Sequence, residues 1–189
     1  MATNEACTIG IAGRRVVVTF LVQHLLRKNG PMLVRPLRDD EQPWKVTTLE
    51  QGWGSTSVAR LGELIDASVL PALVVTDADD RVGLLTYAAR ADDVEVVTIQ
   101  ALDEGRGFGR ALMDDVLRLA VEMNAAKLWL TTTNDNTRAI DFYQRWGMRL
   151  VRLIEGGVDL SRRVKPSIPT IGANGTPLRD ELEFERRLV

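Results

Sequence analysis

Three glycines at alternate positions form the segment of this sequence with the clearest chemical meaning. Gly105, Gly107 and Gly109 lie between a strand-like apolar run at residues 94–101 and a helix-like run at residues 112–123. Glycine lets a backbone approach a ligand closely and adopt a positive φ. A loop of this kind at the start of a helix directs free N–H groups and the positive end of the helix dipole at one point. The segment therefore predicts a binding site for a phosphate group.

Two common phosphate-binding motifs do not fit the spacing of these glycines. A P-loop requires a Lys directly after its last glycine, and no Lys follows here. A dinucleotide fingerprint would need a small residue at Arg110 or at Leu112, depending on the glycine at which it starts. The acidic residue expected about 20 positions further on is also missing. The ligand is therefore expected to be another kind of phosphate-bearing molecule.

The loop resembles the Q/R-x-x-G-x-G/A signature of the GNAT acetyltransferases, which transfer acetyl groups from acetyl-coenzyme A to amines. Gly107 and Gly109 take its two small positions, whereas Glu104 stands where the family usually has Gln or Arg. A second family segment, N-x-x-A-x-x-F/L-Y-x-x-x-G-F, is matched at Asn136, Ala139, Phe142, Tyr143 and Gly147. The resemblance covers residues 74–153, a little under half of the chain.

The resemblance implies that acetyl-coenzyme A is the cofactor and acyl donor, and that backbone amides of residues 105–110 hold its pyrophosphate. Arg106 and Arg110 would add positive charge beside the phosphates. Asn136 would bind the pantetheine arm or cap the helix that it begins. The implied cofactor-binding residues are Ile99, Ala101, Leu102, Gly105, Arg106, Gly107, Phe108, Gly109, Arg110, Ala111, Asn136, Arg138, Ala139 and Phe142.

The resemblance also implies a catalytic role for Tyr143. Attack of an amine on a thioester expels a thiolate, which a positioned phenol can protonate as general acid. The alternative is a Tyr packed at the end of the helix with its hydroxyl bonded to the backbone. The matching Ala139 and Gly147 set its register and favour the catalytic role.

Glu95, on the strand before the glycines, is the candidate general base. An amine acceptor must lose a proton before it attacks, and members of the resembled family often use a strand carboxylate for this step. Val94, Val96 and Val97 are apolar, which predicts a buried position that would help a base act near neutral pH. An ion pair with a cation across the strand is an equally supported interpretation.

The acceptor side of the site is less marked in the sequence. Trp53, in a Gly-Trp-Gly-Ser turn, could form a ligand wall or anchor a helix on the core. The basic residues at 162–165 could attract an anionic acceptor, although short basic runs are usually solvated. The candidate substrate-contacting residues are Trp53, Asp66, Asp159 and Arg162. We expect a small-molecule or peptide amine as the acceptor.

Composition argues against several other classes of function. A net charge of −2 gives no basis for binding nucleic acid or an acidic membrane. With one Cys and one His, Cys7 and His24, a His/Cys metal cluster and a Ser-His-Asp triad are not expected. A single Cys forms no internal disulfide, so a cytoplasmic protein is expected. The resemblance is also compatible with a homodimer.

The elements that position these residues are those of an α/β fold. Strands are expected at residues 32–35, 73–76, 81–89, 94–101, 127–133, 148–154 and 181–188, and helices at residues 39–50, 58–65, 112–123 and 136–146. This order matches the acetyltransferase fold, a mixed, mostly antiparallel sheet flanked by helices. In that fold the sheet splays at the strand before the glycine loop and leaves a cleft for the pantetheine arm.

The expected domain covers residues 32–189, and residues 1–31 form an extension of unknown role. In the extension, residues 18–26 show an apolar stripe at helical spacing, and residues 16–21 equally suit a short strand. Residues 155–180, rich in Gly and Pro, are expected to be a long loop beside the acceptor. The expected function is direct acetyl transfer to a primary amine. The alternative is a catalytically inactive coenzyme A-binding sensor or interaction module.

Overall fold

The computed structural model describes residues 7–11, 14–18, 32–90, 92–103 and 105–188. The chain divides into two compact units, Met1–Gly30 and Pro31–Val189. In the first unit, β1 (Cys7–Ile11) pairs antiparallel with β2 (Arg14–Val18). The strand interpretation of residues 16–21 therefore holds for residues 16–18, and the remainder of that segment lies outside the described residues, as does most of the helical stripe.

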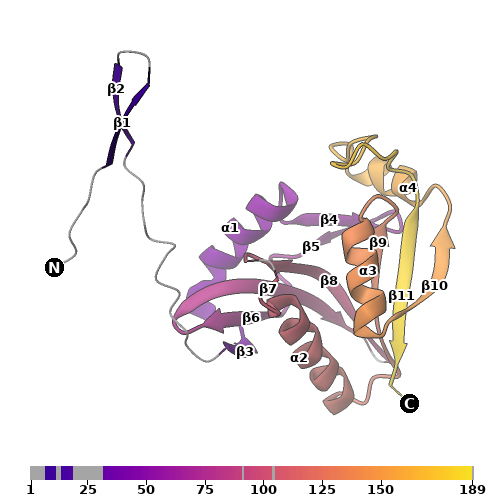
Figure 1. Ribbon diagram of the computed structural model, residues 1–189. Helices are drawn as coiled ribbons and strands as arrows, with labels where there is room; N and C mark the ends of the chain where they lie inside the picture. The colour runs from indigo at the N-terminus through magenta and orange to yellow at the C-terminus, as the bar shows by residue number, and fades with distance from the viewer. Residues whose placement is uncertain (1–6, 12–13, 19–31, 91, 104, 189) are drawn as a thin grey trace. The chain divides into compact units, whose positions relative to one another are not determined.

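The second unit is built on a seven-stranded sheet (Figure 1). In spatial order its strands are β10 (Arg149–Ile154), β11 (Glu181–Arg187), β9 (Lys127–Thr133), β8 (Asp93–Ala101), β7 (Asp80–Ala89), β6 (Ala72–Asp77) and β3 (Met32–Pro36). All neighbouring pairs are antiparallel except β8 and β9, which are parallel. The sheet is thus mixed and mostly antiparallel, as the sequence predicts.

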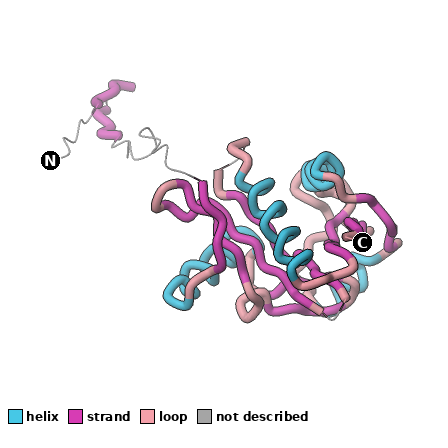
Figure 2. The backbone as a smooth tube through the Cα atoms, turned by 90° about the horizontal axis from the view of Figure 1, so that it is seen from below, coloured by secondary structure: helices cyan, strands magenta, loops and turns pink. Residues whose placement is uncertain are grey.

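Helices lie on both sides of these strands (Figure 2). On one face, α2 (Phe108–Glu122) and α3 (Thr137–Trp146) enclose the main core, in which Leu112 and Val116 pack with Leu130 and Phe184. On the other face, α1 (Gln42–Trp53) packs through Leu49 in a second apolar cluster. A short 3₁₀ turn, η2 (Asp39–Glu41), precedes α1, so the α-helix begins later than its sequence pattern predicts.

The segment at residues 58–65 is a β-hairpin, and the prediction of a helix there is wrong. β4 (Ser57–Arg60) pairs antiparallel with β5 (Glu63–Asp66). The two turn residues, Leu61 and Gly62, both have positive φ, of 52° and 76°, as a type I′ hairpin turn requires. Val58 and Arg60 are buried at period two. Over so short a segment, the apolar positions fit both the helical and the strand period. Gly62 favours the hairpin, because glycine readily adopts the positive φ that the turn requires.

Residues 155–180 are not one continuous loop, which corrects the prediction. They contain α4 (Gly157–Val164), which Gly156 begins in a left-handed conformation. Val158 and Ser161 are the buried side chains of the inward face of this helix. After α4, Arg162 donates hydrogen bonds to the backbone carbonyls of Ile168, Pro169 and Leu178 and so holds the irregular segment together.

Candidate functional site

A split in the sheet creates the site. β8 and β9 are paired in parallel only as far as Val96 and Leu130, although β8 continues to Ala101 and β9 to Thr133. A bulge in the β7–β8 pairing leaves Val97 without a partner at the same level, and bulges bend and twist the strand that carries them. The splay expected before the glycine loop is therefore present, and the facing strand edges are free of pairing with each other.

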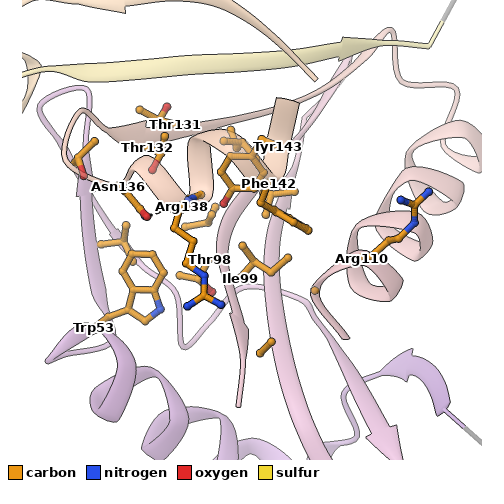
Figure 3. A pocket seen from close by; sticks show the side chains of 18 of the residues that line it. Trp53, Thr98, Ile99, Arg110, Thr131, Thr132, Asn136, Arg138, Phe142 and Tyr143 are labelled. Carbon is orange, nitrogen blue, oxygen red and sulfur yellow. Dashed lines mark hydrogen bonds between the residues drawn. The ribbon is translucent and has the colours of Figure 1, made fainter. Parts of the chain in front are cut away.

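The split forms part of a cavity of about 550 Å³ (Figure 3). Residues of β4, β8, β9, α2 and α3 line it, together with the glycine loop and Trp53 at the end of α1. The cavity receives 14 of the residues singled out in the sequence, namely Trp53, Glu95, Ile99, Ala101, Gly105, Gly107, Phe108, Gly109, Arg110, Asn136, Arg138, Ala139, Phe142 and Tyr143. Segments far apart in the chain, from Trp53 to Glu181, thus converge on one cavity.

The glycine loop closes one end of the cavity. Gly105 and Gly107 have φ of 74° and 84°, which L-residues with a side chain rarely adopt. Gly107 is the N-cap of α2, and its carbonyl accepts the first helical bond, from the N–H of Ala111. The N–H groups of the first turn have no partner within a helix. Such a turn beside a cavity has the geometry of an anion site.

Some residues that the family resemblance implies around this loop have other contacts or lie outside the cavity wall. Arg106 pairs with Asp77 at 2.7 Å and stacks on the Phe108 ring, so its charge is already engaged. Arg110 reaches Asp114 at 3.7 Å. Leu102, Arg106 and Ala111 are not among the lining residues. Glu104, the departure from the family signature, lies outside the described residues.

Helix α3 supplies the wall next to the loop. Asn136 is its N-cap, and its side-chain oxygen accepts a hydrogen bond from the N–H of Ala139 at 3.2 Å. Of its two expected roles, the cap is therefore observed. Arg138 and Tyr143 point into the cavity from this helix (Figure 3). Phe142 packs close to Gly109, where a Cβ would lie 3.6 Å from its ring. The two motifs of the sequence are thus in direct contact.

Tyr143 is buried but remains a lining residue of the cavity. Its ring packs against Phe142 and Phe184, with ring centroids 5.4 and 5.9 Å away. Burial raises the pKa of its hydroxyl above the usual value, because the charged phenolate is poorly solvated there. The phenol therefore stays neutral over a wider range of pH than a free tyrosine, and the two rings fix its orientation.

Glu95 is 1% exposed and forms a two-point ion pair with Arg60 of the hairpin. The Nε and Nη2 atoms of Arg60 donate to the two carboxylate oxygens at 2.5 and 2.6 Å. Burial alone would lower the pKa of Arg60, but the bonds to Glu95 and Glu63 raise it, so the guanidinium stays charged. The buried position is as expected, and the observed contacts are those of the ion-pair interpretation.

Several lining residues were not identified from the sequence. Arg60 carries no motif, and it reaches the site only because the hairpin folds over β8 and β9. Thr131 and Glu181 lie on two strands that the sequence places correctly, but nothing in the pattern indicates which of their side chains face the cavity. The register of β9 and β11 supplies that information.

Of the four candidate acceptor residues, only Trp53 lines the cavity. Trp53 is 41% exposed at the end of α1. Asp66 accepts hydrogen bonds from the N–H and hydroxyl of Ser68, which stabilises the end of β5. Asp159 pairs with Arg162 within α4. The structure places these three charged residues at the hairpin and α4 rather than in the cavity wall.

Among the described residues, no group of three or more His, Cys, Asp or Glu side chains could hold a metal ion. In the described part of the chain, no helix is both long and apolar enough to cross a membrane.

Comparison with known proteins agrees with this architecture. The sequence model of the acetyltransferase (GNAT) family matches residues 42–148. The uncharacterised proteins YxbD and YdhI of Bacillus subtilis (strain 168) are 34% and 31% identical to this chain over 140 and 135 residues. The matched part is 74% of this chain and 88% of YxbD, and 71% of this chain and 84% of YdhI.

Two solved structures have a similar fold. One is the IAA acetyltransferase of Bacillus cereus ATCC 14579, with a TM-score of 0.63 at 17% identity, covering 84% of this chain and 100% of that one. The other is a GNAT family acetyltransferase of Elizabethkingia anophelis with acetyl-CoA bound, with a TM-score of 0.62 at 15% identity, covering 83% and 98%.

Proposed function

The chain belongs to the GNAT acetyltransferase family, and on that premise we propose that it moves an acetyl group from acetyl-coenzyme A directly to a primary amine. The observation that carries the proposal is the cavity at the split between β8 and β9, with a helix N-terminus at one end and a buried phenol in its wall. The family accounts for acetyl transfer in general terms. The direct attack and the amine acceptor are our inference.

The residues fit this donor. The free N–H groups of the first turn of α2 suit a pyrophosphate, since they combine unpaired donors with the positive end of a helix dipole. The unpaired edges of β8 and β9 offer backbone groups to an extended amide-bearing arm. Ile99, Ala101 and Ala139 give this part of the cavity an apolar surface. Arg138, which lines the cavity from α3, adds positive charge.

In the proposed reaction, the amine first loses a proton to water, and the neutral nitrogen then attacks the thioester carbonyl. The C–N bond forms, the C–S bond breaks with its electron pair on sulfur, and the nitrogen releases its second proton to water. Tyr143 donates its proton to that sulfur and regains a proton from water after the thiol has formed. Glu95 was the candidate base, but both of its oxygens are bonded to Arg60. We therefore propose that the Glu95–Arg60 pair holds the hairpin over the site.

Thermal unfolding with and without acetyl-coenzyme A, with NAD and ATP as controls, tests donor binding. A ligand at a hundred times its Kd adds about 2.7 kcal/mol, a rise in Tm of several degrees for a domain of this size. A thiol-release assay with primary amines then tests turnover. A specific shift without turnover on any amine would favour the inactive coenzyme A-binding module, and no shift would reject both functions.

A further inference from the structure

Three carboxylates of the described residues are almost fully buried, and one of them has no cation beside it. Glu41 is paired with Arg35, and Glu95 with Arg60. Glu181 is 2% exposed, yet within the described part of the chain no Lys, Arg or His nitrogen forms an ion pair with it. Its carboxylate accepts hydrogen bonds from the N–H of Leu61 at 2.7 Å and from the hydroxyl of Ser161 at 2.6 Å.

A buried carboxylate held by neutral donors carries an uncompensated negative charge. Glu181 is also a lining residue of the cavity, so this charge faces the space where an acceptor would enter. The two donors come from different elements, the hairpin turn and α4. The carboxylate is thus held in one orientation without being neutralised, as expected of a group that receives its cation from a ligand.

The strand register places Glu181 on the acceptor side. Glu181 lies opposite Thr133 and Glu183 opposite Thr131, while Glu95 lies beside Trp129. Because side chains alternate along strands, Glu95, Thr131 and Glu181 share the face that the hairpin covers. Tyr143 packs on Phe184, which belongs to the opposite face with α2 and α3. The split between β8 and β9 connects the two sides.

A second polar group on this side lacks a partner. The Oγ1 atom of Thr131 is buried and has no hydrogen-bond partner among the residues that the structure describes. Thr131 lines the same cavity and lies on the face of Glu181. A buried hydroxyl left unbonded costs free energy, and an N–H of a bound ligand would satisfy it. Two independent observations, a carboxylate without a cation and a hydroxyl without a partner, therefore indicate a hydrogen-bond donor that carries positive charge.

We propose that Glu181 recognises the acceptor as an ammonium ion, so that the substrate of this enzyme is a cationic alkyl amine. This inference rests on the proposed acetyl transfer and names the class of its acceptor. The carboxylate binds the protonated amine, and Leu61 and Ser161 hold the carboxylate in place. The bound ammonium then gives one proton to water, so that the neutral amine attacks the thioester. Anionic acceptors, which the basic residues near α4 suggested from the sequence, are disfavoured, because Arg162 is engaged with Asp159 and backbone carbonyls.

The test compares Glu181→Gln with wild type in the thiol-release assay, using benzylamine, which is protonated near neutral pH, and aniline, which is not. Gln keeps the size of the side chain and an acceptor for Leu61 but removes the charge. We expect at least a tenfold rise in KM for benzylamine, roughly the worth of one hydrogen bond to a charged group. The kcat/KM for aniline should change less than twofold.

Glu183→Gln is the matched control. Glu183 lies on the same strand and face, is paired with Arg152 and Lys127, and is not a lining residue of the cavity. This substitution should leave the kcat/KM for both amines and the KM for acetyl-coenzyme A unchanged. If Glu181→Gln lowered kcat/KM equally for benzylamine and aniline, the role of Glu181 would be merely structural and the inference would be overturned. Wild-type turnover confined to aniline or to anionic amines, or an absence of turnover despite a specific acetyl-coenzyme A shift, would also overturn it. Absence of that shift would instead overturn the proposed acetyl transfer itself.

Discussion

The hydroxyl of Tyr143 is the group whose chemistry is most directly testable. It is held neutral by burial, and the ring contacts with Phe142 and Phe184 are made by carbon atoms that Phe would keep. We expect Tyr143→Phe to lower kcat by roughly 100-fold or more, since general acids contribute about that factor. The acetyl-coenzyme A shift in Tm should persist. Unchanged turnover in the thiol-release assay would exclude Tyr143 as the proton donor.

Glu95 and Arg60 give a second prediction, about stability. Removing one partner of a buried ion pair costs about 3–5 kcal/mol, and without Glu95 the buried Arg60 would keep only its bond to the exposed Glu63. We expect Glu95→Gln to reduce the free energy of unfolding, measured in urea, by about this amount.

Glu63→Gln is the control for that experiment, because Glu63 bonds the same Arg60 at 2.6 Å but is 63% exposed. Glu63→Gln should lower the free energy of unfolding by less than about 1 kcal/mol. If Glu95→Gln unfolds like wild type and instead loses only kcat, the base interpretation replaces the structural one.

Among the elements, the entry to α1 is tied to β3 by one carboxylate. Glu41 accepts hydrogen bonds from Arg35 at 2.6 and 2.8 Å and from the N–H of Arg38 at 3.0 Å. The bonds from Arg35 outweigh burial and lower the pKa of Glu41 to about 2. These contacts fix where the chain leaves the edge strand and turns into the helix.

The pH dependence of stability follows from this shift. A carboxyl with a pKa below its ordinary value in the folded state stabilises the protein above about pH 4.5, and this contribution disappears as the pH falls toward 2. We expect Glu41→Gln to lose roughly 1.5–3 kcal/mol near neutral pH. The difference from wild type should shrink in urea titrations at decreasing pH. Glu50 is exposed on the same helix, so the free energy of unfolding of Glu50→Gln should change with pH as that of wild type does. If the loss of stability in Glu41→Gln were the same at every pH, Glu41 would not be the group with the lowered pKa.

The hairpin of β4 and β5 joins several distant parts of the site. Arg60 pairs with Glu95 of β8, the N–H of Leu61 bonds to Glu181 of β11, and the backbone carbonyl of Ser57 accepts a bond from Lys165 after α4. The element whose secondary structure was predicted wrongly is thus the one that closes the acceptor side. Its role depends on tertiary contacts that its apolar spacing does not reveal.

At the level of the whole chain, the second unit contains every described residue that lines the cavity, all within residues 53–181. The family match, residues 42–148, also falls inside this unit. We expect a variant comprising residues 31–189 to keep the Tm of the full chain within a few degrees and to show the same shift with acetyl-coenzyme A. Loss of the shift in that variant would assign residues 1–30 a part in donor binding.

The sequence by itself determined the two motifs proposed to bind the acyl donor. The glycine loop and the segment from Asn136 to Gly147 are local: a glycine with positive φ, a helix start and an N-cap depend on neighbours a few positions away. Their spacing was sufficient to identify the family, the mixed and mostly antiparallel sheet that the resemblance implies, and the residues of α3 that line the cavity. The splay after Val96 also followed from the family resemblance.

Apart from Trp53, the part of the cavity proposed for the acceptor was decided by the tertiary structure. Whether Glu95 is free or paired depends on Arg60, 35 positions earlier in the chain, and whether Glu181 faces the cavity depends on the register of β11 against β9. A shift of one residue would turn that carboxylate to the opposite face. Long-range contacts of this kind leave no periodicity in the sequence, so the charge that selects the acceptor becomes visible only when the strands are assembled.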